Sequence, residues 1–287
     1  MPDPAVAPLV STAWLAERLG EPRLRVVDAS WHMPASGRDA KAEFRASHIP
    51  GAVFFDLDAN SAQDTPLPHM LPTAEAFGRS MAALGLSNGD TIVVYDTSGV
   101  NLSAPRAWWM FRAMGHQAVA VLDGGFGKWV AEGRPVEQGV VTPEPGKFVA
   151  QLDAARVVSM AQVNAIGPDG EVQVLDARSP GRFAGTEPEP RPGVRSGHIA
   201  GSRNVHFRSL VREDGTLKPA AELRQLFEAA EVDIARPVVA SCGSGVTACT
   251  IVHALEVLGQ RDTRVYDGSW SEYGSTDGST DEVDERS

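Results

Sequence analysis

Short apolar runs rich in β-branched residues alternate along the chain with stretches that carry apolar residues at helical spacing. The runs L-R-V-V-D at 24–28, T-I-V-V-Y at 91–95 and V-Q-V-L-D at 172–176 are typical of buried strands. The stretches A-E-A-F-G-R-S-M-A-A-L-G at 74–85 and A-E-L-R-Q-L-F-E-A-A at 221–230 are typical of amphipathic helices. This alternation predicts an α/β fold, in which each mostly parallel sheet has helices on both faces.

The second half of the chain repeats the first. L-R-V-V-D-A-S at 24–30 resembles V-Q-V-L-D-A-R at 172–178, and S-H-I-P-G-A at 47–52 resembles G-H-I-A-G-S at 197–202. Two further pairs of segments match in the same order, and every pair is separated by about 150 residues. A period of this length indicates two similar domains in tandem and excludes a solenoid of short repeats.

The repeat and the composition along the chain set the expected domain limits. The first domain is expected at 1–140 and the second at 151–274, joined at 141–150 by a linker rich in Pro and Gly. Residues 275–287 are acidic and of low complexity, and we expect a disordered tail there.

Composition and charge exclude several classes of function. The chain has 287 residues, 43% of them hydrophobic, and a formal net charge of -11, so no global basic field exists to attract nucleic acid or an anionic membrane. Two cysteines form no disulfide framework and are too few for a structural zinc site, so no metal is expected. Without a basic, apolar leader or a run long enough to span a bilayer, we expect a soluble, cytoplasmic protein.

Both cysteines lie in one segment, S-C-G-S-G-V-T-A-C-T at 241–250, between an expected strand and an expected helix. Unpaired N–H groups at the start of such a helix favour the thiolate form of a cysteine in the preceding turn. Gly243 and Gly245 allow the backbone to curl into an anion nest, and Ser244 and Thr247 add hydroxyl donors. We therefore interpret Cys242 as reactive, although most free cysteines are simply small buried apolar residues.

The other residues around Cys242 limit the reactions that this cysteine can catalyse. Cys249 falls inside the expected helix and is expected in the core, while the repeat places Asp96 opposite Cys242 in a first domain that has no cysteine. A cysteine-dependent phosphatase needs an arginine at the sixth position after the cysteine, and Ala248 stands there. A sulfur carrier needs only a nucleophilic thiolate and a nest for the persulfide, which this loop offers.

These features together resemble the two-domain rhodanese-type sulfurtransferases, and most closely the 3-mercaptopyruvate sulfurtransferases. The resemblance covers residues 9–273 and includes the tandem repeat, the C-G-S-G-V-T-A-C loop, S-A-P-R-A-W-W-M-F and R-F-A-G-T-E-P-E-P-R. It implies that the Cys242 thiolate takes a sulfur atom from a donor, becomes a persulfide, and gives the sulfur to cyanide, a small thiol or reduced thioredoxin. Ping-pong kinetics are expected from this two-step covalent route.

The resemblance also suggests the donor. Thiosulfate enzymes of the family carry basic residues directly after the cysteine, whereas this loop is neutral, with residues 243–247 reading Gly243, Ser244, Gly245, Val246 and Thr247. A neutral loop favours 3-mercaptopyruvate and implies that these residues bind it. Its carboxylate and carbonyl need guanidinium partners elsewhere, and by resemblance these are Arg182 and Arg191. The alternative is that both arginines form surface ion pairs with Glu187 or Glu189.

A relay of serine, histidine and aspartate is also proposed for mercaptopyruvate enzymes. Ser244 matches the loop serine, and His48 and Asp39 of the first domain are its possible partners. His198 occupies the place of His48 in the second domain, so a shared structural role for both histidines is equally open.

Three functions therefore remain open. The first is a sulfurtransferase with 3-mercaptopyruvate as donor, and the second is a thiosulfate:cyanide sulfurtransferase. The third is a non-catalytic sulfur-carrier or scaffold module. No cofactor is expected because the sulfur travels on the protein, and with both domains in one chain a monomer is expected to suffice.

Overall fold

The computed structural model describes residues 6–140, 142–167 and 170–275. The described residues form two compact units, which we call unit 1 and unit 2. Unit 1 holds residues 6–63, 71–153 and 211–217, and unit 2 holds residues 64–70, 154–210 and 218–275. The expected acidic tail lies, from residue 276 onward, outside the described residues.

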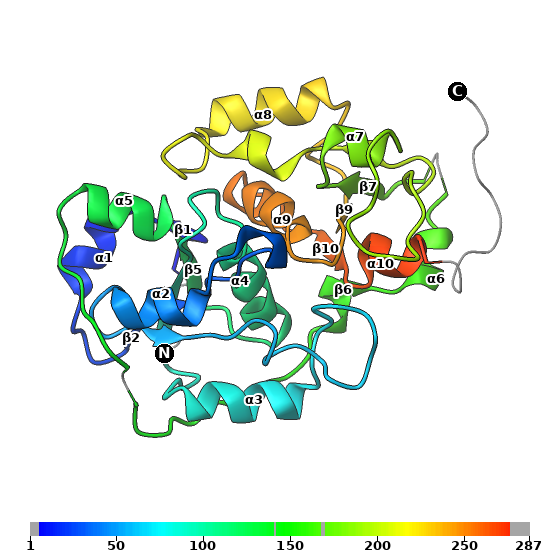
Figure 1. Cartoon of the computed structure of the whole chain (residues 1–287). Coiled ribbons are helices and arrows are strands. Elements are labelled where there is room, and N and C mark those ends of the chain that lie inside the picture. The colour runs from blue at the N-terminus through cyan, green and yellow to red at the C-terminus, as the bar shows by residue number, and fades with distance from the viewer. Residues whose placement is uncertain (1–5, 141, 168–169, 276–287) are drawn as a thin grey trace. The chain divides into compact units, whose positions relative to one another are not determined.

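Unit 1 is built on a five-stranded parallel sheet with the order β1-β5-β4-β2-β3. Figure 1 shows α4 beside the central strands, and α4 packs on β4 and β5. Helices α1 and α5 pack against each other. The elements are β1 (Leu9–Val10), α1 (Thr12–Arg18), β2 (Leu24–Asp28), a 3-10 turn η1 (Pro34–Ser36), α2 (Ala40–Ala46), β3 (Val53–Phe54), α3 (Ala74–Ala83), β4 (Thr91–Tyr95), α4 (Ala104–Ala113), β5 (Val119–Leu122) and α5 (Gly125–Ala131).

Unit 2 repeats this architecture with the parallel order β6-β10-β9-β7-β8, so the predicted fold class is confirmed. Helix α9 packs on the central strands β7, β9 and β10, as α4 does in unit 1 (Figure 1). The elements are η2 (Ala154–Arg156), β6 (Val157–Val158), α6 (Met160–Asn164), β7 (Gln173–Asp176), α7 (Pro180–Phe183), β8 (Arg203–Asn204), η3 (Phe207–Leu210), α8 (Ala220–Ala229), β9 (Val238–Ser241), α9 (Ala248–Val257), β10 (Thr263–Tyr266) and α10 (Ser269–Tyr273).

Alternation along the strands explains why helices cover both faces. In unit 1, Val26, Val93 and Ala120 are register partners on neighbouring strands, and all three belong to one buried cluster with Leu15 of α1 and Trp129 of α5. Successive strand residues point to opposite faces, so the intervening buried valines face the other layer of helices. Because all strands of a sheet are parallel, their carboxyl ends lie at the same edge, where α/β proteins bind their ligands.

Two short segments belong to a different unit from the one expected from the sequence. Residues 64–70, expected in the first domain, are part of unit 2, and residues 211–217, expected in the second, are part of unit 1. In unit 1, Gly215 accepts a hydrogen bond from the Asn101 side chain at 3.1 Å, and the Leu217 amide donates to Asp123 at 2.8 Å. These contacts are non-local, so the internal repeat gives no sign of them.

Candidate active site

Cys242 follows directly on the last residue of β9, at the carboxyl edge of the unit 2 sheet. Its side chain is buried, with only 2% of the residue exposed. The chain turns through Gly245, whose φ of 76° lies in the left-handed region that favours glycine, and α9 then begins at Ala248. Val246 is buried and Thr247 is half-buried at the start of the helix. The predicted strand, turn and helix around the cysteine are therefore present.

Cys249 occupies the first part of α9 and is fully buried, as expected for a core residue. Its thiol donates to the Gly245 carbonyl at 3.2 Å. This contact ties the helix to the turn that carries Cys242 and leaves Cys249 in the interior.

Ser244 is hydrogen-bonded to a histidine that the sequence analysis did not single out. Its Oγ lies 3.0 Å from Nδ1 of His69, and both residues are buried within unit 2. His69 has a φ of 61°, a backbone conformation that non-glycine residues adopt rarely and that clusters at functional sites. A serine two residues after the cysteine thus has an acid–base side chain as its partner.

Arg182 places its guanidinium directly beside the loop. A Cβ on Gly243 would lie only 3.0 Å from Nη2 of Arg182, so a larger residue at this position would press on the guanidinium. The same guanidinium is held by Glu189, through Nε at 3.1 Å and Nη2 at 2.5 Å. The ion pair named as the alternative to donor binding therefore exists, but its carboxylate is buried, its guanidinium is half-buried, and it holds the cation next to the cysteine loop.

A chain of buried charges continues behind Arg182. Glu189 also accepts from Arg178 at 2.8 Å, and Arg178 in turn binds Asp176 at 2.6 Å. The side chains of Arg178, Glu189 and Asp176 are each at most 4% exposed. Two carboxylates and two guanidinium groups balance in charge, and Glu189 has a bidentate partner in Arg182, which such buried pairs need to be stable.

Arg191 is also close to the cysteine loop. Its Nη1 lies 3.5 Å from the Ser271 hydroxyl, which itself donates to the Gly243 carbonyl. Burial lowers the pKa of Arg191, the nearby Cys242 raises it, and the positive charge of Arg182 lowers it. A guanidinium remains protonated under such shifts. Arg182 and Arg191 thus bring two positive charges to the cysteine loop.

His48 and Asp39 have other partners than the expected relay. The ring of His48 is fully buried, stacks on Phe44 at 4.1 Å, and donates from Nδ1 to the Phe44 carbonyl at 2.7 Å. His198 makes the same two contacts with Phe183 in unit 2, at 4.0 and 2.8 Å, which is the shared structural role left open above. Within the described residues, the histidine hydrogen-bonded to Ser244 is His69.

Asp39 is the N-terminal cap of α2, where its carboxylate accepts from the Ala42 amide at 3.0 Å. This bond satisfies one of the unpaired N–H groups of the helix, which is a common role of aspartate at that position. A catalytic role for Asp39 or His48 stays a prediction.

The equivalent loop of unit 1 shows what such a turn binds. Tyr95 and Ser241 are equivalent ends of β4 and β9, so Asp96 occupies the place of Cys242. The Asp96 carboxylate accepts from the amides of Ser98, Ser103 and Ala104 at 2.9 Å each. Three backbone donors converge on a fixed negative charge there, which is the arrangement that would stabilise a thiolate in unit 2.

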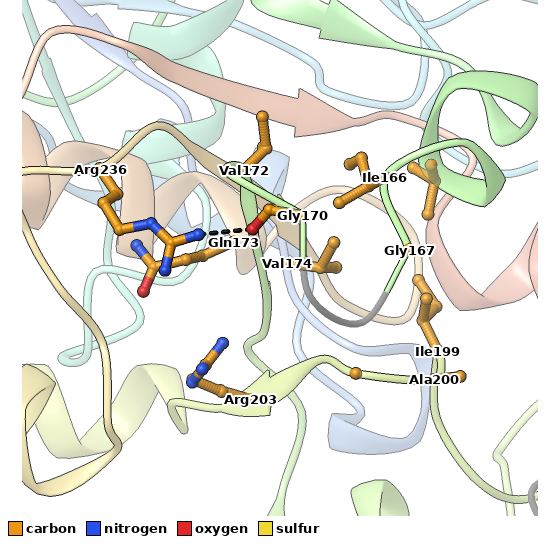
Figure 2. A pocket seen from close by; sticks show the side chains of 12 residues that line it. Ile166, Gly167, Gly170, Val172, Gln173, Val174, Ile199, Ala200, Arg203 and Arg236 are labelled. Carbon is orange, nitrogen blue, oxygen red and sulfur yellow. Dashed lines mark hydrogen bonds between the residues drawn. The ribbon is translucent and has the colours of Figure 1, made fainter.

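A separate cavity of about 180 Å³ lies at the other edge of the unit 2 sheet (Figure 2). Its lining includes Gln173, the first residue of β7, and Arg236, which precedes β9, whereas Cys242 follows the opposite end of β9. Arg236 donates to the Gly170 carbonyl there, as Figure 2 shows. This cavity is therefore distinct from the cysteine site. Among the described residues, no group of three His, Cys, Asp or Glu side chains could hold a metal ion.

The fold and the cysteine loop define the class of protein. Residues 11–132 and 159–276 each match the rhodanese-like domain, and the chain belongs to the rhodanese family. It is 46% identical to 3-mercaptopyruvate sulfurtransferase of Homo sapiens over 270 residues, which are 92% of this chain and 91% of that protein. It is 45% identical to thiosulfate sulfurtransferase of Cricetulus griseus over 273 residues, again 92% and 91%.

A solved structure agrees with this assignment. SseA from Escherichia coli, described among the 3-mercaptopyruvate sulfotransferases with the rhodanese fold, matches with a TM-score of 0.84 and 39% identity. The match covers 93% of this chain and all of SseA. The predicted resemblance to this family is therefore confirmed. In the part of the chain that the structure describes, every helix is too short or too polar to cross a membrane.

Two of the residues at the site escaped the sequence analysis or were misinterpreted. His69 lies in P-L-P-H-M, a proline-rich stretch that has no counterpart in the second half, so comparing the two halves does not point to this histidine. The sequence does offer one indication of its role: the histidine stands in a loop that only one half of the chain has, and such loops often carry functional residues. Glu189 was considered only as a surface partner of the arginines, whereas it is 4% exposed.

Proposed function

We propose that this chain is a sulfurtransferase that moves a sulfur atom from 3-mercaptopyruvate, through a persulfide on Cys242, to a thiol or to cyanide. The observation that carries the proposal is the position of the Arg182 guanidinium against Gly243, directly beside the cysteine. A monoanionic keto acid needs a planar cation for its carboxylate and a neutral loop around its sulfur, and both are present.

The chemical step follows from these groups. The Cys242 thiolate attacks the donor sulfur, a sulfur–sulfur bond forms, and the bond between sulfur and the donor methylene breaks. Its electron pair moves through the carbonyl as the pyruvate enolate, which takes up the proton released from the donor thiol and leaves as pyruvate. Ser244 with His69 offers a route for that proton, while Arg182 and Arg191 stabilise the negative charge on the departing keto acid.

The second step returns the enzyme to its starting state. Cyanide attacks the outer sulfur of the persulfide, leaves as thiocyanate, and releases the Cys242 thiolate. A small thiolate attacks in the same way and leaves as a persulfide, and reduced thioredoxin stays among the expected acceptors. The two half-reactions share one covalent intermediate, so we expect ping-pong kinetics in steady-state measurements.

The main alternative is a thiosulfate:cyanide sulfurtransferase. Relatives named for either donor are almost equally similar to this chain, at 46% and 45% identity, so overall similarity does not select between them. The loop favours 3-mercaptopyruvate, because Gly243 and Ser244 provide no positive charge for the thiosulfate dianion and Arg182 leaves little room for a longer residue at 243. A non-catalytic sulfur-carrier module is the remaining alternative.

Steady-state kinetics with both donors test the donor assignment. We expect kcat/KM for 3-mercaptopyruvate to exceed that for thiosulfate, and Arg182→Lys to lower the former about tenfold or more because lysine lacks the guanidinium fork. Arg224→Lys is the matched control, since Arg224 is exposed and donates to the Leu258 carbonyl. A higher kcat/KM for thiosulfate would favour the alternative donor, and no turnover with either would favour the carrier module.

We also propose that the enzyme works as a monomer in the cytoplasm. His69 and Arg182, which contact the cysteine loop, belong to the same unit as Cys242, and both cysteines are free thiols, as in a reducing compartment. Analytical ultracentrifugation of the active protein tests the first point, and localisation of the tagged protein tests the second.

A further inference from the structure

Ser269 has an unusual backbone conformation next to the cysteine loop. It is the first residue of α10, is completely buried, and has a φ of 49°, in the left-handed region that favours glycine. The equivalent residue of unit 1, in the matching L-D-G-G-F segment, is Gly125 with a φ of 54°. Unit 2 thus places a serine where the backbone geometry suits a glycine, and strain of this kind persists only where surrounding structure enforces it.

The Ser269 hydroxyl binds the nucleophile's own peptide group. Its Oγ accepts from the Cys242 amide at 3.2 Å and donates to the Tyr266 carbonyl at 2.8 Å. The next residue, Trp270, donates its amide to the Cys242 carbonyl at 2.9 Å. Both polar backbone groups of Cys242 are therefore fixed by the first two residues of α10.

Unit 1 makes only part of this arrangement. The Phe126 amide donates to the Asp96 carbonyl at 3.1 Å, as Trp270 does to Cys242. A Cβ on Gly125, however, would lie 2.6 Å from the Asp96 carbonyl oxygen, so a serine would not fit there without a shift. The space for a side chain, the serine and the bond to the amide all occur in the unit that has the cysteine.

We propose that Ser269 is a positioning residue, whose hydroxyl holds the Cys242 peptide so that the sulfur stays among the donors of its loop. This inference rests on the proposed role of Cys242 as the nucleophile. Without the hydroxyl, the Cys242 peptide loses one of its two anchors, and its side chain leaves the optimal position for a larger fraction of the time. Small displacements of a reacting group lower rates strongly.

Two variants separate positioning from stability. Ser269→Ala removes the hydroxyl and keeps the strained φ, whereas Ser269→Gly removes the hydroxyl and relieves the strain. We expect both to slow alkylation of Cys242 by iodoacetamide at pH 7 about tenfold, to move the pH profile of alkylation to higher pH, and to lower kcat similarly. The Tm of Ser269→Gly should exceed that of Ser269→Ala by about 2–4 °C.

Ser30→Ala is the matched control. Ser30 is a buried serine of unit 1 whose hydroxyl accepts from Thr97, one position after Asp96, at 2.9 Å. This variant should lower Tm and leave the alkylation profile of Cys242 unchanged.

The results decide the inference independently of the proposed function. Native alkylation and turnover in both Ser269 variants would overturn it, and so would a lower Tm with an unchanged pH profile, because Ser269 would then have a structural role only. Alkylation needs no sulfur donor. If the native enzyme takes no sulfur from either donor, the proposed function fails, whereas the effect of Ser269 on the thiol can still be measured.

Discussion

The guanidinium of Arg182 is held by the buried carboxylate of Glu189 through two nitrogens, Nε at 3.1 Å and Nη2 at 2.5 Å. In Glu189→Gln, an amide replaces one of the two accepting oxygens and the negative charge is lost. Arg182 then loses the partner that fixes it beside the cysteine loop. We expect KM for 3-mercaptopyruvate to rise about tenfold while kcat changes little, because the loss weakens donor binding and hardly affects the rate of the chemical step.

Glu187→Gln is the control for this prediction. Glu187 lies on the same segment, is exposed, and accepts from the Ser179 hydroxyl at 2.7 Å. Its KM should equal that of the native enzyme. Equal KM values for Glu189→Gln and the native enzyme would show that Arg182 needs no anchor, or that it does not bind the donor.

The two buried histidines predict opposite results on substitution. His69→Asn removes the partner of Ser244, and we expect at least a tenfold loss of kcat with 3-mercaptopyruvate, in the range of lost acid–base assistance. His48→Asn removes a ring stacked on Phe44, and we expect a lower Tm with kcat retained. Steady-state kinetics and thermal melting of both variants measure the contrast. Loss of kcat in His48→Asn without loss of stability would support the relay as the sequence predicted it.

A buried carboxylate in unit 1 predicts how stability varies with pH. Burial raises the pKa of Asp28 to about 6, although hydrogen bonds from Ser30 lower it. The equivalent Asp176 has Arg178 as a partner. Because the folded state binds the proton of Asp28 more tightly than the unfolded state, this stabilising contribution is present below about pH 4 and is lost as the pH rises through about 6.

Asp28→Asn tests this dependence, because asparagine stays neutral at every pH. Two pKa units correspond to about 3 kcal/mol. Because the unfolded carboxyl is already partly ionised at pH 4, the free energy of unfolding of the variant, relative to that of the native protein, should rise by about 2 kcal/mol between pH 4 and pH 7. Urea denaturation at both pH values measures it. A difference between the two proteins that does not vary with pH would contradict the shifted pKa.

Most of the fold could be predicted from the sequence, because the segments that form each sheet recur in both halves. Strand patterns, glycine turns and apolar helices recur in both halves, so the equivalence of Asp96 and Cys242 could be read directly. The position of Cys249 in the core also followed from its place inside the expected helix. These features depend on local chemistry, which a single sequence displays.

The remaining site residues depend on contacts between distant parts of the chain. His69 reaches Ser244 from a loop with no counterpart in the repeat, and Glu189 is buried because Arg178 and Arg182 surround it. Ser269 differs from a typical helix-start serine in its positive φ and in its hydrogen bond to the amide of the distant Cys242. Neither spacing nor composition encodes such pairings.

The proposed function depends on the transfer of sulfur from 3-mercaptopyruvate to Cys242. The most direct test is the intact mass of the reduced protein after exposure to 3-mercaptopyruvate and, separately, to thiosulfate, with Cys242→Ser as control. We expect 3-mercaptopyruvate to add the mass of one sulfur atom, thiosulfate to add little, and the control to gain none. Equal loading of the control, or no loading of the native protein by either donor, would contradict sulfur transfer to Cys242.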